Sequence, residues 1–188
     1  MKKVLLTAFL GFSSIAFSQE LKDKPEAKEA DKTLLVPADQ AETDAKKKAA
    51  EEKTKLPKPY DPKANAEKDI QNLIAKAKKE KKNIMIQAGG NWCIWCLRFN
   101  NFVQTTPELK QIVDENYLYY HLNYSPDNKN EKVFSKYINI KEQQFYPFFI
   151  FLDKKGNKIS VQQSDVLEEG KGYSLQKVKD FLDKWKPE

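Results

Sequence analysis

Hydrophobic residues after about position 60 follow two patterns, helical spacing and short continuous runs. Apolar positions three and four apart predict amphipathic helices, and short apolar runs bounded by polar turns predict buried strands. The first predicted helix runs from Asp61-Pro62 to about Lys81, the second from Cys93 to about Gln104, and the third from Thr106 to the strand that begins at Tyr117. A short helix is predicted around 133–138, and the last helix runs from Ser174 to Trp185. The predicted strands are Ile84–Ala88, Tyr117–Asn123, Phe148–Leu152 and Lys158–Gln163, and the segment Glu168–Tyr173 is predicted as a loop.

This order of elements predicts an α/β fold. Helices separate the first three strands, so right-handed crossovers and parallel pairing are expected among them. Asp153–Asn157 is a turn sequence, and it predicts that the last two strands form an antiparallel hairpin. The result is a mixed four-stranded sheet flanked by helices.

The first 60 residues differ from the rest in composition. Residues 1–18 combine Met1-Lys2-Lys3, the apolar run from Val4 to Phe17 and a small-x-small site, which together predict a cleaved signal peptide. Residues 19–60 are rich in Lys, Glu, Ala and Asp, and they predict a charged flexible linker with some helical tendency over Asp39–Lys53. The folded domain is expected to span 61–188, and the protein to be exported, in the periplasm.

The formal net charge is +6, but the lysines are interspersed with Glu and Asp and form no cluster with aromatic residues. This pattern gives no support for nucleic-acid binding and is typical of a solvated surface.

The candidate chemistry lies in Trp92-Cys93-Ile94-Trp95-Cys96, which contains both cysteines of the chain. A C-x-x-C at a strand-to-helix junction is typical of a redox pair, because a helix N-terminus favours a thiolate over a thiol. Cys93 would lie at that end, on an exposed corner, and Cys96 would face inward within disulfide distance.

Three other interpretations stay open. A zinc site needs about four ligands, and two Cys with one His are too few, so no metal is predicted. A structural disulfide gains little from closing so short a loop. A buried, inert pair fits poorly with Gly89-Gly90-Asn91 and the flanking tryptophans, which suggest a turn at the surface.

From Asp61 to Trp185 the chain resembles the thioredoxin-fold superfamily, in particular exported bacterial thioredoxin-like thiol–disulfide oxidoreductases. The resemblance is carried by Trp92-Cys93-Ile94-Trp95-Cys96, by Leu122-Asn123, and by the run from Phe145 to Phe151 before the hairpin. It implies that Cys93 attacks, that Cys96 resolves, and that Pro147 is a cis-proline that directs the backbone of Tyr146 towards the disulfide. Trp92, Ile94, Trp95, Tyr146 and Pro147 are the predicted substrate-binding residues.

Two positions depart from the family pattern. Gln87 stands six residues before Cys93, where the family often has a buried carboxylate, and His121 stands where lysine is common. His121, whose ordinary pKa is near neutrality, is a candidate proton acceptor for Cys96, with Gln87 as a second relay residue. The alternative is that His121 is a packed sheet residue.

The predicted function is a secreted protein thiol–disulfide oxidoreductase that works without a cofactor. The Ile94-Trp95 dipeptide lacks the His of strongly oxidising relatives, which favours the reductase direction. Its partners would be proteins with disulfides and a redox partner, either a membrane-embedded donor or another thioredoxin-like protein. A redox-inert thioredoxin-fold binding module tethered by the charged tail is the alternative, and a disulfide isomerase is a third candidate, although no dimerisation element is evident.

Overall fold

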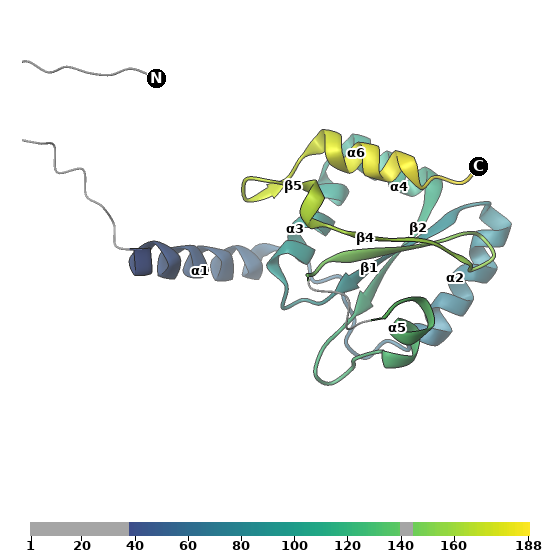
Figure 1. Ribbon diagram of the computed structural model, residues 1–188, viewed down its shortest axis with the longest axis horizontal. Coiled ribbons are helices and arrows are strands. Elements are labelled where there is room, and N and C mark those ends of the chain that lie inside the picture. The colour runs from purple at the N-terminus through teal and green to yellow at the C-terminus, as the bar shows by residue number, and fades with distance from the viewer. Residues whose placement is uncertain (1–37, 140–144) are drawn as a thin grey trace, which may run out of the picture. The chain divides into compact units, whose positions relative to one another are not determined.

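The computed structural model describes residues 38–139 and 145–188 (Figure 1). The predicted signal peptide lies outside these residues. The helices are α1 (Ala38–Lys55), α2 (Ala66–Glu80), α3 (Ile94–Thr105), α4 (Pro107–Asn116), α5 (Glu131–Tyr137), the 3-10 turn η2 (Asp165–Leu167) and α6 (Leu175–Lys184). The strands are β1 (Asn83–Gly89), β2 (Tyr117–Asn123), β3 (Phe148–Leu152), β4 (Lys158–Gln163), β5 (Glu168–Glu169) and β6 (Gly172–Tyr173).

The central sheet has four strands in the order β2-β1-β3-β4. Strand β1 pairs in parallel with β2, and β3 pairs antiparallel with both β1 and β4. Every residue of β1 and β3 is buried, which explains why both segments read as nearly continuous apolar runs. The predicted mixed four-stranded sheet with flanking helices is confirmed.

The direction of the third strand differs from the prediction. We expected β3 to run parallel to the first two strands, but Ala88 at the end of β1 faces Phe148 at the start of β3. The intervening α5 has only seven residues, about 10 Å of helix, which is too short to cross the length of the sheet. Strand β3 therefore starts at the edge where β1 and β2 end, and this places Pro147 near the cysteines.

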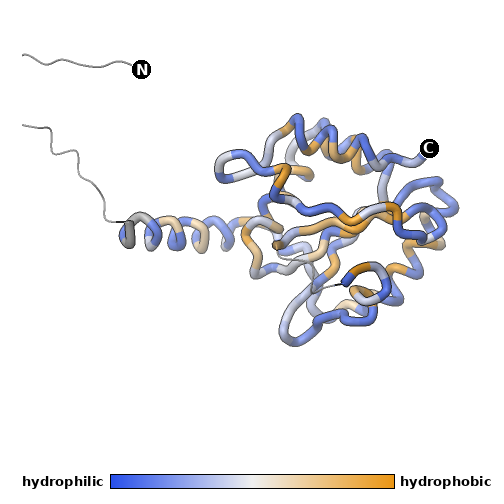
Figure 2. Tube along the Cα trace, viewed as in Figure 1, coloured by the Kyte–Doolittle hydropathy of each residue, from blue (hydrophilic) through white to orange (hydrophobic). Residues whose placement is uncertain are grey.

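Helices cover both faces of the sheet (Figure 1). On one face α2 and α5 bury an apolar layer that includes Ile70 and Phe134. On the other face α3, α4 and α6 pack over Phe149 and Phe151. Figure 2 shows the hydrophobic residues gathered along the sheet and the inner helix faces, whereas α1 has no continuous hydrophobic side.

The helical tendency predicted over Asp39–Lys53 is confirmed by α1, but this end of the predicted linker packs on the domain. Residues 38–55 form a helix, and Tyr60 is only 2% exposed, so the segment before residue 61 packs with the domain. Helix α2 begins at Ala66, with Asn65 as its N-cap, rather than at Pro62. The Asn65 side chain accepts a hydrogen bond from the Lys68 amide, and this cap sets the start of the helix.

The predicted loop over Glu168–Tyr173 contains a short hairpin. Strands β5 and β6 pair antiparallel, and β6 lies beside α3. Tyr173 anchors the hairpin, because its ring packs against Phe99 of α3 and its hydroxyl donates to the Trp95 carbonyl at 3.1 Å.

Candidate thiol–disulfide site

The two cysteines lie where β1 passes into α3. The amide of Cys93 donates to the Gly90 carbonyl at 3.0 Å, which closes a tight turn, and Cys93 is the N-cap residue of α3. Cys96 lies one turn further along the helix, and the two residues form a disulfide with their Cα atoms 5.3 Å apart. The strand–turn–helix arrangement predicted for the motif is therefore present.

The two cysteine residues differ in their exposure to solvent. Cys93 is 6% exposed and Cys96 is fully buried. The prediction of an exposed corner is wrong for Cys93 itself, because Cys93 packs in a buried cluster with Tyr60 and Cys96, against which Trp95 and Tyr146 also lie. Of the two cysteines, Cys93 is the one with exposed surface.

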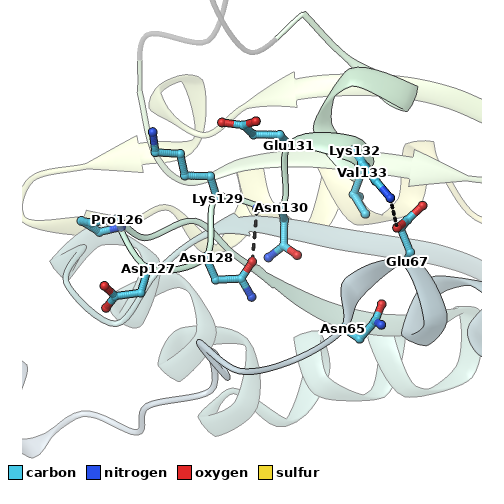
Figure 3. A pocket seen from close by; sticks show the side chains of 10 residues that line it. All are labelled: Asn65, Glu67, Pro126, Asp127, Asn128, Lys129, Asn130, Glu131, Lys132 and Val133. Carbon is cyan, nitrogen blue, oxygen red and sulfur yellow. Dashed lines mark hydrogen bonds and ion pairs between the residues drawn. The ribbon is translucent and has the colours of Figure 1, made fainter.

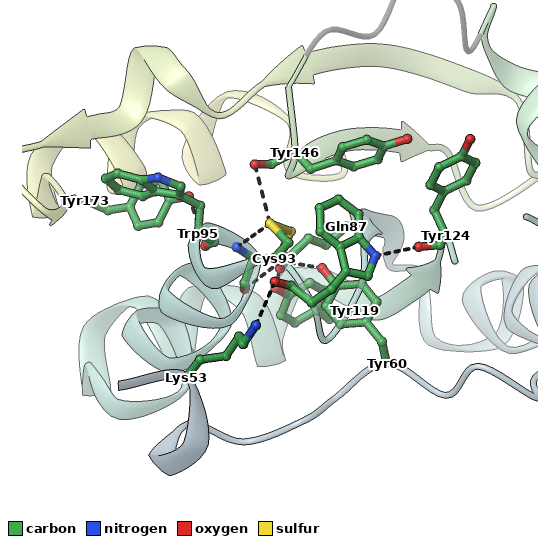
Figure 4. Close-up of a disulfide and its surroundings, with 11 residues drawn as sticks. Lys53, Tyr60, Gln87, Cys93, Trp95, Tyr119, Tyr124, Tyr146 and Tyr173 are labelled. Atoms are coloured by element: carbon green, nitrogen blue, oxygen red, sulfur yellow. Dashed lines mark hydrogen bonds between the residues drawn. A yellow bond between two sulfur atoms is a disulfide. The ribbon is translucent and has the colours of Figure 1, made fainter. Parts of the chain in front are cut away.

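Backbone groups converge on the Cys93 sulfur (Figure 4). The Cys96 amide donates to Cys93 Sγ at 3.1 Å, as expected at a helix N-terminus. On the opposite side the Tyr146 carbonyl oxygen lies 3.6 Å from Cys93 Sγ, and the Tyr146–Pro147 peptide bond is cis. The Tyr146 backbone therefore faces the disulfide, as the resemblance implied, while the Pro147 side chain is buried.

Next to Cys96 lies a hydrogen-bonded cluster of polar side chains centred on the buried Gln87. Its amide nitrogen donates to the Cys96 carbonyl at 2.9 Å and to the Tyr60 hydroxyl at 2.7 Å. Its amide oxygen accepts a hydrogen bond from the Tyr119 hydroxyl. Burial raises the pKa of Tyr60 and of Tyr119 well above the ordinary tyrosine value, so both stay protonated.

His121 lies beside Gln87 in the β1–β2 register, packed against the rings of Tyr60 and Tyr119. Burial lowers the pKa of His121 to about 4, so the ring is neutral and a weak base near pH 7. Its Nε2 is buried without a hydrogen-bond partner among the described residues. These observations favour the packed-residue interpretation, and none of them tests the relay role that the sequence suggested for His121.

An aromatic surface adjoins Cys93 on one side. Trp92 is 49% exposed, its ring packs edge-on against Tyr146, and its indole N–H donates to the Tyr124 carbonyl at 2.7 Å. Tyr124 stacks on Tyr146, with ring centroids 5.6 Å apart. An apolar pocket of about 510 Å³ beside Trp92 is lined by Trp92, Tyr124, Ser125, Pro126 and Lys129. Of the predicted substrate-binding residues, Trp92 and Tyr146 therefore form one continuous surface.

Trp95 and Ile94 lie at the start of α3 and are partly buried. The Trp95 ring packs edge-on against Tyr173 of β6, and the Arg98 guanidinium lies 4.9 Å from its centre. The Trp95 side chain therefore packs against the hairpin, and it also lies against the buried cluster of Tyr60, Cys93 and Cys96.

The C-terminal end of α1 contacts this region. Arg98 donates two hydrogen bonds to the Glu52 carboxylate, at 2.9 and 2.6 Å, and this pairing lowers the pKa of Glu52. Lys53 Nζ lies 3.4 Å from the Trp92 carbonyl. Helix α1, which lies within the segment predicted as a charged linker, thus ends beside Trp92 and Arg98.

A separate polar pocket of about 500 Å³ lies beside the loop after β2 (Figure 3). Asn128 and Asn130 hold this loop in place, because Asn128 donates to the Pro62 and Ala64 carbonyls and Asn130 donates to the Asn123 carbonyl. Neither cysteine lines this polar pocket. Pro126 and Lys129 line both this pocket and the apolar pocket beside Trp92.

Sequence reasoning missed Tyr60, Asn91 and Tyr124 as site residues. Tyr60 is the single aromatic residue in positions 19–60, which was a usable signal for a buried anchor. The contact of Tyr124 with Trp92 joins residues 32 positions apart, and no local pattern predicts it. Within the described ranges no group of three or more His, Cys, Asp or Glu could hold a metal ion.

Comparison with known proteins agrees with the geometry. Residues 65–154 match the model of a thioredoxin-like family. The chain is similar to the crystal structure of a disulphide isomerase from Xylella fastidiosa Temecula1, with 19% identity and a TM-score of 0.60, covering 69% of this chain and 97% of that one. A DsbH oxidoreductase structure gives 19% identity and a TM-score of 0.43, covering 60% and 81% of the two chains. No match was found among curated proteins.

The chain therefore has a thioredoxin-like fold, with its Cys-x-x-Cys pair at disulfide distance. This agrees with the fold that the sequence predicted.

Proposed function

We propose that this protein is a thiol–disulfide oxidoreductase that acts on protein disulfides, with reduction of the substrate as the favoured direction. The observation that carries the proposal is the arrangement of the pair at the start of α3. The more accessible sulfur, Cys93, accepts the Cys96 amide hydrogen at 3.1 Å, and the fully buried Cys96 lies behind it.

The reaction follows from this arrangement. The Cys93 thiolate attacks one sulfur of a substrate disulfide, and the other substrate sulfur leaves with the electron pair. Cys96 then attacks Cys93 Sγ, which releases the reduced substrate and forms the Cys93–Cys96 disulfide. The helix N-terminus stabilises the attacking thiolate, and the Trp92–Tyr146 surface offers an apolar contact for an unfolded segment.

A redox partner must reduce the pair again after each cycle. We propose export through the signal peptide predicted over 1–18, and a periplasmic protein or a membrane-embedded donor as the source of electrons. Among the described residues, no helix has the length and apolar character needed to cross a membrane.

The test compares the wild type with Cys93→Ser and Cys96→Ser in insulin reduction by dithiothreitol. We expect both variants to lose the catalysed rate by roughly three orders of magnitude, because a lost nucleophile removes the whole mechanism. In a separate reaction without dithiothreitol, pre-reduced Cys96→Ser should accumulate a stable mixed disulfide with insulin through Cys93, visible on a non-reducing gel.

Equilibration with glutathione would give the direction of electron flow. A reduction potential closer to about −270 mV than to about −120 mV supports the reductase direction. A wild-type pair that stays oxidised in excess dithiothreitol, with Cys93 resistant to alkylation, would instead support the redox-inert binding module.

A further inference from the structure

Asn91, in the turn just before Cys93, holds the backbone of Tyr60 in place. Asn91 Nδ2 donates to the Tyr60 carbonyl at 2.7 Å, and Asn91 Oδ1 accepts from the Tyr60 amide at 3.2 Å. The Tyr60 side chain then packs in one buried cluster with Cys93 and Cys96 (Figure 4). The asparagine two positions before Cys93 therefore fixes a residue 31 positions away in the sequence.

The hydrogen-bond pattern leaves the Tyr60 hydroxyl hydrogen available. The Cys96 carbonyl can only accept, so the Gln87 group that points at it must be the NH₂. The same NH₂ donates to the Tyr60 oxygen, so the Tyr60 hydroxyl acts there as an acceptor. Among the hydrogen bonds within residues 38–139 and 145–188, none is donated by this hydroxyl.

The Tyr60 hydroxyl and the Cys96 sulfur both lie next to Gly89. A Cβ at position 89 would lie 2.4 Å from Cys96 Sγ and 3.1 Å from the Tyr60 hydroxyl oxygen. Both atoms thus border the space that the missing side chain leaves open. A thiolate formed there is buried, and a buried charge without a hydrogen-bond donor is strongly disfavoured.

We propose that the Tyr60 hydroxyl donates a hydrogen bond to Cys96 Sγ whenever the disulfide is opened, and so stabilises Cys96 as the leaving group. The inference rests on the proposed oxidoreductase function. In the reductive step a thiolate of a dithiol donor attacks Cys93 Sγ, the Cys93–Cys96 bond breaks, and the electron pair leaves on Cys96 Sγ. The tyrosine keeps its proton, and the second donor thiol then completes the reduction by displacing Cys93 from the mixed disulfide.

The surroundings suit a neutral donor. The groups beside the hydroxyl are the Gln87 amide and the His121 ring, whose centre lies 5.2 Å from that of Tyr60. Neither is charged near neutral pH, because burial lowers the pKa of His121 to about 4. At position 87, where the family that the sequence resembles often has a carboxylate, this site therefore offers a neutral amide, with the neutral Tyr60 hydroxyl beside it.

Tyr60→Phe tests the proposal, because it removes the hydroxyl and keeps the ring. We expect the equilibrium of the full chain with glutathione to shift about fivefold towards the disulfide, the size of one ordinary hydrogen bond. The rate at which dithiothreitol reduces the pair should fall by a similar factor. A purely structural role would change thermal stability and leave the redox equilibrium unchanged.

Two matched variants separate the possible causes. Tyr117→Phe removes another buried hydroxyl, which donates to the Leu182 carbonyl, and should leave the equilibrium unchanged. Tyr119→Phe removes the hydroxyl on the other side of the Gln87 amide, and a fivefold shift there as well would overturn a direct role for Tyr60. If Tyr60→Phe does not fold, Asn91→Ala should shift the equilibrium in the same direction, and no shift would overturn the proposal.

Insulin reduction by the wild type distinguishes this inference from the proposed function. An active wild type with an unshifted Tyr60→Phe equilibrium refutes the role of Tyr60 alone. An inactive wild type whose equilibrium still shifts refutes the oxidoreductase function and supports the hydrogen bond.

Discussion

The two sulfurs of one disulfide lie in contrasting surroundings. Cys93 is bordered by backbone groups, the Cys96 amide and the Tyr146 carbonyl, and by an aromatic surface that solvent reaches. Cys96 is fully buried and is backed by Gly89, Gln87 and Tyr60. This difference means that an external thiol has access to Cys93 only. Cys96 is surrounded by buried groups that such a thiol does not contact.

The two sides also have different origins in the chain. The Cys93 side is built mainly from the motif itself and from the turn before β3. The Cys96 side combines β1, β2 and the segment before α2, so its groups come from positions 60, 87, 89 and 119. Predictions for the buried side therefore concern packing and protonation, and those for the accessible side concern the contact with α1.

The largest effect is expected for Gly89→Ala on the buried side. The new Cβ would lie 2.4 Å from Cys96 Sγ, closer than any real contact, so the pair or the strand must shift. We expect a loss of about 3 kcal/mol in the free energy of unfolding, measured by chemical denaturation. Gly172→Ala is the control, because nothing lies within 4 Å of its added Cβ, and equal losses in both variants would contradict close packing at Cys96.

A medium effect is expected for His121→Phe, and it depends on pH. The native ring has a pKa of about 4, whereas an unfolded histidine binds its proton near pH 6.5, so the unfolded state gains protons first as the pH falls. The wild type should therefore lose about 2 kcal/mol of unfolding free energy between pH 7.5 and 5 that the variant retains. Parallel pH curves for the two proteins would show that His121 is not buried as a neutral ring.

The same variant addresses the proton-relay hypothesis. Because the neutral ring is a weak base near pH 7, we expect disulfide exchange between pH 6 and 8 to proceed at the wild-type rate in His121→Phe. A slower release of the mixed disulfide, seen in stopped-flow fluorescence, would restore His121 as the proton acceptor for Cys96.

The smallest effect is expected on the accessible side, where α1 meets α3. Glu52→Gln weakens the double hydrogen bond with Arg98 and should cost about 0.5–1 kcal/mol, because the pair is partly exposed. Hydrogen exchange of the α1 amides should become faster. Glu42→Gln, which breaks an exposed pair with Lys46 on the same helix, is the control and should change stability less. Equal exchange rates in the two variants would mean that Arg98 does not hold α1.

Local patterns predicted most elements of the domain. The apolar runs at β1 and β3 agree with the structure because these strands are buried along their whole length, and the helical stripes of α3, α4 and α6 agree because each helix buries one face. The direction of β3 was wrong, since it depends on how far the short α5 can carry the chain. Tyr60 was assigned to the linker, because a single aromatic residue in a charged run shows its role only through contacts with Asn91 and Gln87.

By itself, the sequence determined that a Cys-x-x-Cys pair opens a helix directly after a buried strand, since periodicity and turn residues are local properties. It also determined the helices and strands that form the thioredoxin-like sheet. The resemblance also implied that the Tyr146 backbone lies towards the disulfide. Only the tertiary structure decided how far Cys93 is covered, in which direction β3 runs, and which hydroxyl lies near Cys96. These features depend on contacts between residues that are far apart in the chain, and only the packing of the folded domain brings those residues together.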